Sequence, residues 1–292
     1  MRGVTKAIIA LLVFVLVGLS AVGKPWSAER IVKDVTYCTV AGVDLTMDLY
    51  YPQTGGSPYP VVIYVHGGGW TSGSKRGGAG MRDVPTLLAH GYVVAAIDYR
   101  LAPAYKFPAQ IEDVKCAVRY LRVHADELRI DPDRIGAYGG SAGGHLVALL
   151  GTADDDAFSG DCPWEASSRV QAVVDMFGPA DFSLFEFIGS KKAMSVFGAS
   201  DATDPIFAQA SPVTWASSDD PPFLILHGDK DPVVPLSQSQ SLYDHLQAAG
   251  VPAELVVVKN AGHGFKPTGG KIDPSRQEIS ELIASFFDRW LR

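Results

Sequence analysis

The sequence predicts an α/β fold in which a mostly parallel sheet carries helices on both faces. Short apolar runs rich in β-branched residues recur along the 292 residues, and most lack the polar alternation of a half-exposed strand. Segments with the apolar spacing of an amphipathic helix separate these runs. Buried strands that alternate with helices pair in parallel, so the two observations together predict this architecture.

The strands are expected where apolar runs are flanked by turn residues. The segment 31–52 contains two strands, IVKDVTYCTV and the partly alternating DLTMDLYYP, and the glycines and prolines of 54–60 form a turn. Later strands are expected at 61–65, 92–99, 133–140, 169–178, 221–229 and 253–260.

Helices are expected between the later strands. Within 108–128, apolar residues recur at Ile111, Val114 and Leu121, and Pro108 suits a first helical turn. Further helices are expected at 142–151, 235–249 and 275–292.

The segment 179–216 interrupts this alternation. It has little strand character and carries many aromatic residues: Phe182, Phe185, Phe187, Phe197, Phe207 and Trp215. A short helical insertion that forms a small lid over a pocket is the favoured interpretation, and a patch packed on the body of the domain is the alternative. No linker and no repeat is visible, so residues 24–292 are expected to form one domain.

The composition excludes several classes of protein. With 47% hydrophobic and 20% charged residues, the chain suits a globular core rather than disorder. The formal net charge is −7 and no basic stripe is present, so no nucleic-acid partner is expected. The metalloprotease motif H-E-x-x-H and the dinucleotide motif G-x-G-x-x-G do not occur, so no metal and no cofactor is expected.

The first 23 residues have the three parts of a secretory signal. Arg2 and Lys6 precede the uncharged apolar run 7–19, and small residues follow before Lys24. The run is shorter than the ~20 residues that cross a bilayer comfortably. We therefore expect an exported protein, periplasmic or extracellular, with no stable membrane partner. An uncleaved anchor through 7–19 is the alternative.

The three cysteines are Cys38, Cys116 and Cys162. In an exported protein they allow one disulfide and leave one thiol, but the sequence does not choose the pair. Buried cysteines that act as small hydrophobic residues are the alternative.

The stretch AYGGSAGGH (137–145) surrounds Ser141 with small residues. Ser141 falls where a buried strand ends and a helix begins. A turn this sharp forces its central residue to positive φ and brings Gly139 close to Gly143, where side chains would clash. The turn also lifts the hydroxyl clear of the sheet, so Ser141 is the candidate nucleophile.

A serine hydroxyl needs a base to take its proton and an acid to orient that base. In sheets of this kind the acid and then the histidine follow the serine along the chain. His263 lies in the loop NAGHGF after the last strand, so it is the candidate base. Asp231 lies further out on the loop HGDKDPVVP than Asp229, so Asp231 is the candidate acid and Asp229 is expected to brace the turn.

The stretch HGGGW (66–70) follows a buried strand, where a loop that binds an oxyanion belongs. The backbone N–H groups of Gly68 and Gly69, with that of Ala142, are the candidate donors. The substrate pocket is expected to involve four apolar side chains: Trp70, Phe177, Val234 and Phe265.

These motifs together resemble the α/β-hydrolase esterases. HGGGW, DYRLAPAYKFPAQIEDVKCAVRYL, GGSAGGH, HGDKDPVVP and GHGF are similar to those of the hormone-sensitive-lipase-like group and, more closely, of small bacterial carboxylesterases that include feruloyl-esterase-like enzymes. The resemblance covers about 31–292 and implies an eight-stranded sheet, the triad Ser141, Asp231 and His263, and no cofactor. The chain has Gly140 where the lipase-like group has an acid, and 24–60 is too short for that group's N-terminal cap.

The motifs predict a serine carboxylesterase that acts on small-molecule esters with short acyl chains. A feruloyl or acetyl-xylan esterase acting on plant polysaccharide is one alternative. A prolyl-peptidase-like serine peptidase is a second, and an inactive binding module on the same fold is a third. The oligomeric state is not determined by the sequence.

Overall fold

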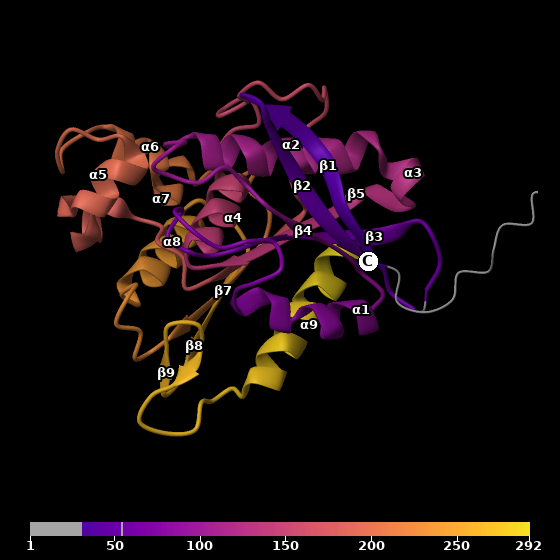
Figure 1. The fold of residues 1–292 in the computed structure, drawn as a ribbon. Coiled ribbons are helices and arrows are strands. Elements are labelled where there is room, and N and C mark those ends of the chain that lie inside the picture. Colours follow the sequence, from indigo (N-terminus) through magenta and orange to yellow (C-terminus); the bar gives the residue numbers. More distant parts are fainter. Residues whose placement is uncertain (1–30, 54) are drawn as a thin grey trace, which may run out of the picture.

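An eight-stranded sheet forms the centre of the computed structural model, which describes residues 31–53 and 55–292 (Figure 1). The predicted signal segment 1–23 lies outside the described residues. The strand order is β1-β2-β4-β3-β5-β6-β7-β8. The six strands from β4 to β8 pair in parallel, and β2 pairs antiparallel with both β1 and β4. The prediction of a mostly parallel sheet of eight strands is confirmed.

The strands of this sheet are β1 (Ile31–Val40), β2 (Val43–Tyr50), β3 (Tyr59–Val65), β4 (Val93–Ile97), β5 (Ile130–Gly140), β6 (Ala172–Met176), β7 (Phe223–Gly228) and β8 (Ala253–Val258). A short hairpin of β9 (Ala261–Gly262) and β10 (Lys266–Pro267) follows β8. The helices outside 179–216 are α1 (Val84–Ala89), α2 (Ala109–Val123), α3 (Ala125–Leu128), α4 (Ala142–Thr152), α8 (Ser237–Ala248) and α9 (Arg276–Leu291).

Helices cover both faces of the sheet, because successive side chains of a strand point to opposite faces. On β3, Val61 and Ile63 pack in one apolar cluster with α2, α4 and α8. Val62 and Tyr64 pack in a second cluster with α1 and α9. The strand is buried on both faces, which explains why its sequence is a continuous apolar run.

Two helical segments differ from the prediction. The segment 108–128 is not one helix, since α2 ends at Val123 and α3 begins at Ala125. His124 has φ −99° and ψ 20°, outside the helical range, and α3 turns there to pack against β5. The sequence reading also missed α1 and the 3-10 turn η1 (Ala79–Arg82) before it. Both are too short to show a helical period.

The segment 179–216 forms a series of short helices, as predicted. They are η2 (Phe182–Leu184), η3 (Glu186–Gly189), α5 (Lys191–Phe197), α6 (Ile206–Ala210) and α7 (Pro212–Trp215). Figure 1 shows α5, α6 and α7 together at one end of the molecule. The rings of Phe182 and Phe197 lie 4.9 Å apart, and Phe197 lies 5.3 Å from Trp70 of the body. The aromatic residues therefore attach the insertion to the rest of the domain.

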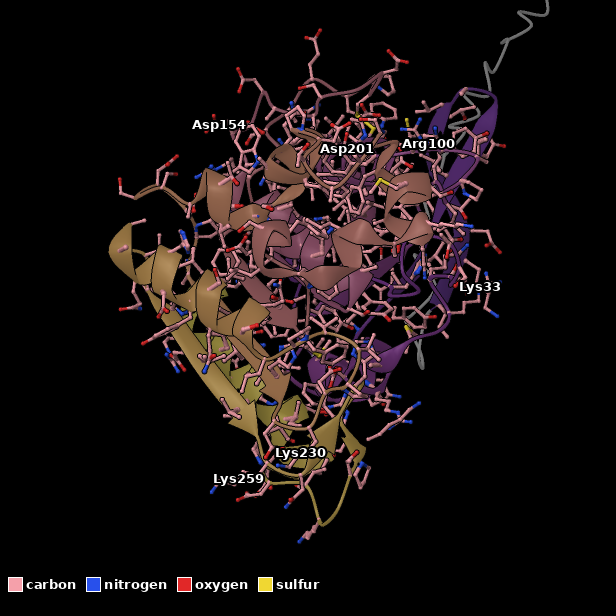
Figure 2. All side chains as sticks on the ribbon, turned by 90° about the vertical axis from the view of Figure 1, so that its left-hand side faces the viewer. Lys33, Arg100, Asp154, Asp201, Lys230 and Lys259 are labelled. Atoms are coloured by element: carbon pink, nitrogen blue, oxygen red, sulfur yellow. A yellow bond between two sulfur atoms is a disulfide. The ribbon has the colours of Figure 1, made fainter. Side chains whose placement is uncertain are left out.

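A disulfide joins Cys116 of α2 to Cys162 in the loop before β6, and Cys38 is a buried free thiol. This pairing answers a question that the sequence left open. Figure 2 marks the disulfide in yellow and shows charged side chains such as Lys33, Lys230 and Lys259 toward the rim of the molecule.

Candidate active site

Ser141 occupies the sharp turn between β5 and α4. Its φ of 58° and ψ of −122° are strained for a residue with a side chain. A Cβ atom on Gly139 would lie 2.5 Å from the carbonyl oxygen of Gly143, and one on Gly143 would lie 2.1 Å from that of Val65. The two glycines are therefore required by close backbone approach, for the steric reason expected from the sequence.

Asp231 and His263 meet in a hydrogen bond. The Nδ1–H group of His263 donates to Oδ2 of Asp231 at 2.7 Å. The Asp231 side chain is 1% exposed and the His263 ring is 26% exposed, so the ring lies between the buried acid and solvent. Burial alone would raise the pKa of Asp231, but hydrogen bonds from His263 and from the N–H groups of Val233 and Val234 hold it below its ordinary value. Asp231 is therefore ionised and able to orient the ring.

The neighbouring polar residues are engaged elsewhere. Asp229 accepts the N–H group of Ala261 at 3.3 Å, which braces the turn as expected. His227 is buried and bonds Ser239 through Nδ1 at 2.7 Å and the carbonyl of Val234 through Nε2 at 2.9 Å. Nε2 of His227 also lies 3.6 Å from Oδ2 of Asp231, so His227 sits beside the acid while Ser239 and Val234 hold its ring nitrogens.

Phe177 links the serine turn to the histidine. Its ring lies 4.9 Å from that of His263, and a Cβ atom on Gly140 would lie 2.9 Å from its Cζ atom. The N–H group of Ser141 also donates to Met176, the residue before Phe177, at 2.9 Å. Across the described residues, the Ser141 hydroxyl forms no hydrogen bond to His263. The structure thus joins His263 to Asp231 directly and places Ser141 across the same phenylalanine.

The loop after β3 lies against the serine. A Cβ atom on Gly67 would lie 3.4 Å from Cβ of Ser141. Gly68 and Gly69 follow with φ of 129° and 59°, and the carbonyl of Gly68 accepts the Ser72 hydroxyl at 3.0 Å. The N–H groups of Gly68 and Gly69 have no acceptor among the described residues, and that of Ala142 begins a helix, where no intrahelical partner exists. These three N–H groups thus have no hydrogen-bond acceptor among the described residues, and the loop that carries two of them lies against Ser141.

His66 anchors the start of this loop. One ring nitrogen bonds the carbonyl of Gly67 at 2.7 Å, and the ring stacks on Tyr99 with centroids 4.2 Å apart. The Tyr99 hydroxyl donates to the carbonyl of His66 at 2.9 Å. His66 is thus a structural support of the loop.

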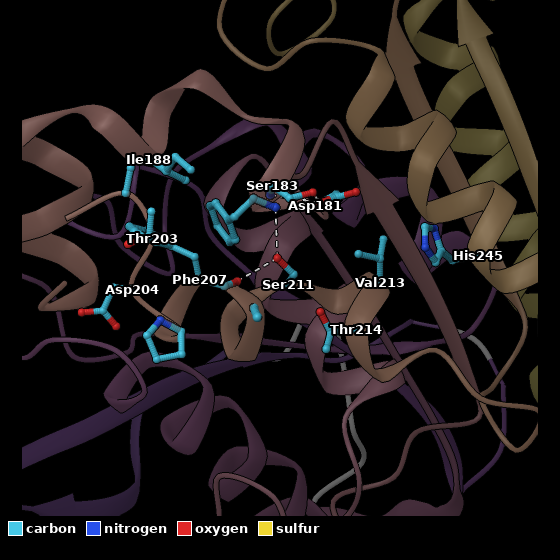
Figure 3. Close-up of a pocket in the computed structure, with 14 residues that line it drawn as sticks. Asp181, Ser183, Ile188, Thr203, Asp204, Phe207, Ser211, Val213, Thr214 and His245 are labelled. Atoms are coloured by element: carbon cyan, nitrogen blue, oxygen red, sulfur yellow. Dashed lines mark hydrogen bonds between the residues drawn. The ribbon is translucent and has the colours of Figure 1, made fainter. Parts of the chain in front are cut away.

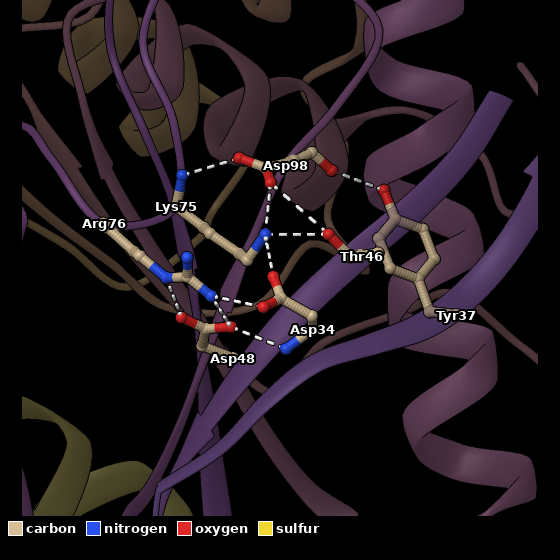
Figure 4. Close-up of polar contacts among 7 residues, drawn as sticks. All are labelled: Asp34, Tyr37, Thr46, Asp48, Lys75, Arg76 and Asp98. Atoms are coloured by element: carbon tan, nitrogen blue, oxygen red, sulfur yellow. Dashed lines mark hydrogen bonds and ion pairs between the residues drawn. The ribbon is translucent and has the colours of Figure 1, made fainter.

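A polar network anchors the far part of the same loop (Figure 4). The ammonium group of Lys75 contacts Asp98 at 2.5 Å, Thr46 at 2.7 Å and Asp34 at 3.0 Å. The N–H group of Lys75 donates to the second oxygen of Asp98 at 2.7 Å. Arg76 adds a bond to the buried Asp48 at 2.6 Å. The network fastens the loop to β1, β2 and the end of β4.

The buried side chain of His145, on α4, hydrogen-bonds to the glycine loop and to the insertion. Its Nδ1 accepts from the indole N–H of Trp70 at 3.1 Å, and its Nε2–H donates to the carbonyl of Ala210 at 2.7 Å. Burial lowers the pKa of His145 to about 4, so a neutral ring makes both bonds. The serine helix α4, the glycine loop and helix α6 of the insertion are thereby joined.

The four predicted pocket residues are almost completely buried. Trp70 is 4% exposed, while Phe177, Val234 and Phe265 are each 2% exposed. Phe265 packs on Phe177 with centroids 4.9 Å apart. Trp70 and Val234 pack in one apolar cluster and Phe177 and Phe265 in the other, so all four are core side chains that offer little surface of their own.

A separate pocket of about 380 Å³ lies within the insertion and contains no predicted site residue (Figure 3). Asp181, Ser183, Thr203 and Asp204 line it together with Ser211, Phe207 and His245. Ser211 accepts the N–H group of Phe182 at 3.0 Å and donates to the carbonyl of Phe207 at 2.8 Å. These polar groups hold the insertion together.

Neither a metal centre nor a membrane span is found in the part of the chain that the structure describes. No group of three or more His, Cys, Asp or Glu side chains there is arranged to hold a metal ion. No helix there has the length and apolar character to cross a bilayer. The sequence-based prediction did not single out Gly67, although it stands in the motif HGGGW, or Lys192, which stands in no motif.

Comparison with known proteins finds similar chains among ester hydrolases. A family model described as BD-FAE matches residues 47–246. Esterase LipC of Mycobacterium tuberculosis is 36% identical over 235 residues, which cover 77% of this chain and 58% of LipC. The probable carboxylic ester hydrolase LipM of the same organism is 36% identical over 221 residues, which cover 72% of this chain and 50% of LipM. The chain thus spans about half the length of these curated relatives.

Two solved structures cover nearly the whole fold. A truncated carbohydrate esterase from gut microbiota has a TM-score of 0.76 at 29% identity and covers 89% of this chain and 95% of its own. Esterase 2 of Thermogutta terrifontis with bound propionate has a TM-score of 0.73 at 27% identity and covers 91% of this chain and 94% of its own. The α/β-hydrolase fold and the resemblance to esterases are confirmed.

Proposed function

Because the chain belongs to the BD-FAE family, we propose that it is a serine carboxylesterase that hydrolyses carboxylic esters with short acyl chains. One observation carries the proposal: the 2.7 Å bond between His263 and the buried Asp231 lies across Phe177 from the strained Ser141 turn. The esterase names of the relatives support the same reaction class.

The geometry suits a two-step acyl transfer. The Ser141 oxygen attacks the ester carbonyl as His263 takes the hydroxyl proton, and Asp231 stabilises the charged ring. The N–H groups of Gly68, Gly69 and Ala142 would bind the carbonyl oxygen as it becomes negative. His263 then protonates the departing alcohol. A water molecule then gives a proton to His263 and attacks the acyl carbonyl carbon; the bond to the Ser141 oxygen breaks, and His263 returns the proton to that oxygen as the acid leaves.

The insertion and the four buried apolar side chains predicted to line the pocket would shape the substrate pocket. We propose that segment 179–216 acts as a small lid, because α6 is bonded through His145 to the loop that carries the oxyanion donors. Trp70, Phe177, Val234 and Phe265 would support the acyl-binding wall from behind.

We further propose that the protein is exported, which the N-terminal segment and the Cys116–Cys162 disulfide support.

A second candidate is an esterase that removes feruloyl or acetyl groups from plant polysaccharide. The specific support is the solved structure described as a carbohydrate esterase, which matches along almost its whole length. The two candidates share the same catalytic residues and differ in the alcohol and acyl groups that they accept.

The test uses residues 24–292 and p-nitrophenyl esters from acetate to palmitate, with methyl ferulate and acetylated xylan. We expect turnover to peak at acetate or butyrate and Ser141→Ala to lower kcat by on the order of 10⁴–10⁶. A preference for ferulate or acetylated xylan would assign the second candidate. A folded protein that hydrolyses none of these substrates would refute the esterase proposal.

A further inference from the structure

An ammonium group from the insertion lies against the glycine loop. A Cβ atom on Gly69 would lie 2.4 Å from Nζ of Lys192 and 3.1 Å from its Cε atom. Lys192 is the second residue of α5, far along the chain from Gly69. The insertion therefore places a positive charge directly on the loop that carries the proposed oxyanion donors.

This charge is within reach of a molecule bound at Ser141. Gly67 packs against Ser141, and Gly69 follows two residues later. Two residues span at most ~7 Å, so the ammonium group lies on the order of 10 Å from the serine. An ester attacked by Ser141 can extend over that distance, whereas the reacting carbonyl itself lies closer to the serine than to Lys192.

Lys192 is exposed and forms no ion pair with any acid whose side chain the structure describes. Lys191 is its neighbour on α5, and the aliphatic chain of Lys106 packs near Gly198 at the end of that helix. The insertion also carries four acids, Asp181, Glu186, Asp201 and Asp204, so the segment as a whole is not basic and the charge beside Gly69 is that of Lys192 itself. An unpaired cation beside a binding site attracts anions in a way that depends on ionic strength.

The helix that carries Lys192 is fixed to the body. The N–H group of Phe107 donates to the carbonyl of Val196 at 2.9 Å, and Phe197 packs on Trp70 with centroids 5.3 Å apart. Ser190 caps the helix by accepting the N–H group of Ala193 at 3.1 Å. Although the lysine side chain is exposed, its backbone holds a defined place beside the loop.

We propose that Lys192 binds a negatively charged group of the substrate, so that the enzyme prefers esters carrying a carboxylate several bonds from the scissile carbonyl. The proposal rests on the esterase function and names a substrate class for the same site. Neutral esters lack the group that Lys192 would bind, and they react without its help.

The test compares matched anionic and neutral esters. On the acyl side the pair is p-nitrophenyl hydrogen glutarate and its amide, p-nitrophenyl glutaramate. On the alcohol side it is para-acetoxybenzoate and para-acetoxybenzamide. We expect Lys192→Met to lower the anionic-to-neutral ratio of kcat/KM for one pair by roughly fivefold to tenfold, mainly through KM. Lys192→Arg retains the ratio, Lys191→Met is the matched control, and added salt lowers the wild-type ratio.

An unchanged ratio for both pairs in Lys192→Met would overturn the proposal, as would equal losses on anionic and neutral esters. Binding of glutarate and para-hydroxybenzoate to the Ser141→Ala protein is measured separately, because it needs no turnover. Weaker binding of either anion after Lys192→Met would support the anion site even if no ester were hydrolysed, in which case the esterase function alone fails. Equal binding of both anions in the two proteins would refute the site.

Discussion

At the scale of single residues, the site depends on side chains whose partners fix their chemical state. Asp231 is held ionised by its hydrogen bonds, and it holds one tautomer of His263 by accepting from Nδ1. That leaves Nε2 as the ring nitrogen able to accept a proton from a serine. Asp229, two residues earlier on the loop, accepts a backbone N–H group instead.

Replacing Asp231 by Asn tests this assignment. The amide no longer fixes the ring in the tautomer that accepts a proton, so we expect kcat for a short ester to fall by on the order of 10³–10⁴. Asp229→Asn is the matched control and is expected to change kcat by less than about tenfold, since Asp229 does not contact the ring. Steady-state kinetics measure both variants. If Asp229→Asn lost the larger share of activity, the acid would have to be reassigned.

At the scale of elements, the loop between β3 and α1 is the part that needs external support. It is irregular, and its glycines leave its own backbone few internal bonds. His66 anchors its start, and Lys75 and Arg76 fasten its later part to strands β1 and β2 (Figure 4). Its geometry is therefore imposed by neighbours far away in the sequence.

Lys75→Met removes the centre of that support. Asp98 loses its ammonium partner, but it is partly exposed, so water can replace part of the lost interaction. We therefore expect the free energy of unfolding to fall by about 1–3 kcal/mol. Because the N–H donors of the loop would lose their alignment, kcat for a short ester should fall by on the order of tenfold with little change in KM. Chemical denaturation and steady-state kinetics are the measurements, with the exposed Lys33→Met on β1 as control. A stability loss with no change in kcat would show that the network does not position the donors.

At the scale of the whole molecule, a buried carboxyl group beneath the serine helix affects stability. Asp175 of β6 is completely buried, and one of its oxygens accepts the N–H group of Gly178 at 2.9 Å. Its other oxygen has no partner among the described residues. Burial raises the pKa of Asp175 to about 7, against an opposing contribution from the Gly178 bond.

This shift makes stability depend on pH in a definite direction. Between about pH 4 and pH 7 the folded protein keeps the Asp175 proton and the unfolded chain releases it, so stability falls as pH rises through that range. Asp175→Asn removes the carboxyl group that titrates, so its stability should not fall over this range as that of the wild type does. We therefore expect the difference in free energy of unfolding, variant minus wild type, to be about 1–3 kcal/mol larger at about pH 8 than at about pH 5. Thermal unfolding at the two pH values measures the difference, with the exposed Asp154→Asn as control. Parallel pH profiles for wild type and Asp175→Asn would contradict the expectation.

The sequence by itself determined the features that depend on local pattern. Continuous apolar runs predicted buried strands, and the small residues around Ser141 predicted a tight turn, because sterics act between near neighbours. The sequence did not reveal α1, whose six residues are too few for a period, or the break in the helix after Val123, where the backbone of His124 leaves the helical range.

Only the tertiary structure decided which distant residues meet. It paired Cys116 with Cys162, buried the four side chains predicted to line the pocket, and brought Lys192 to Gly69. Each of these contacts joins residues from different elements. Local periodicity carries no information about such contacts, since they depend on how the sheet and the insertion pack together.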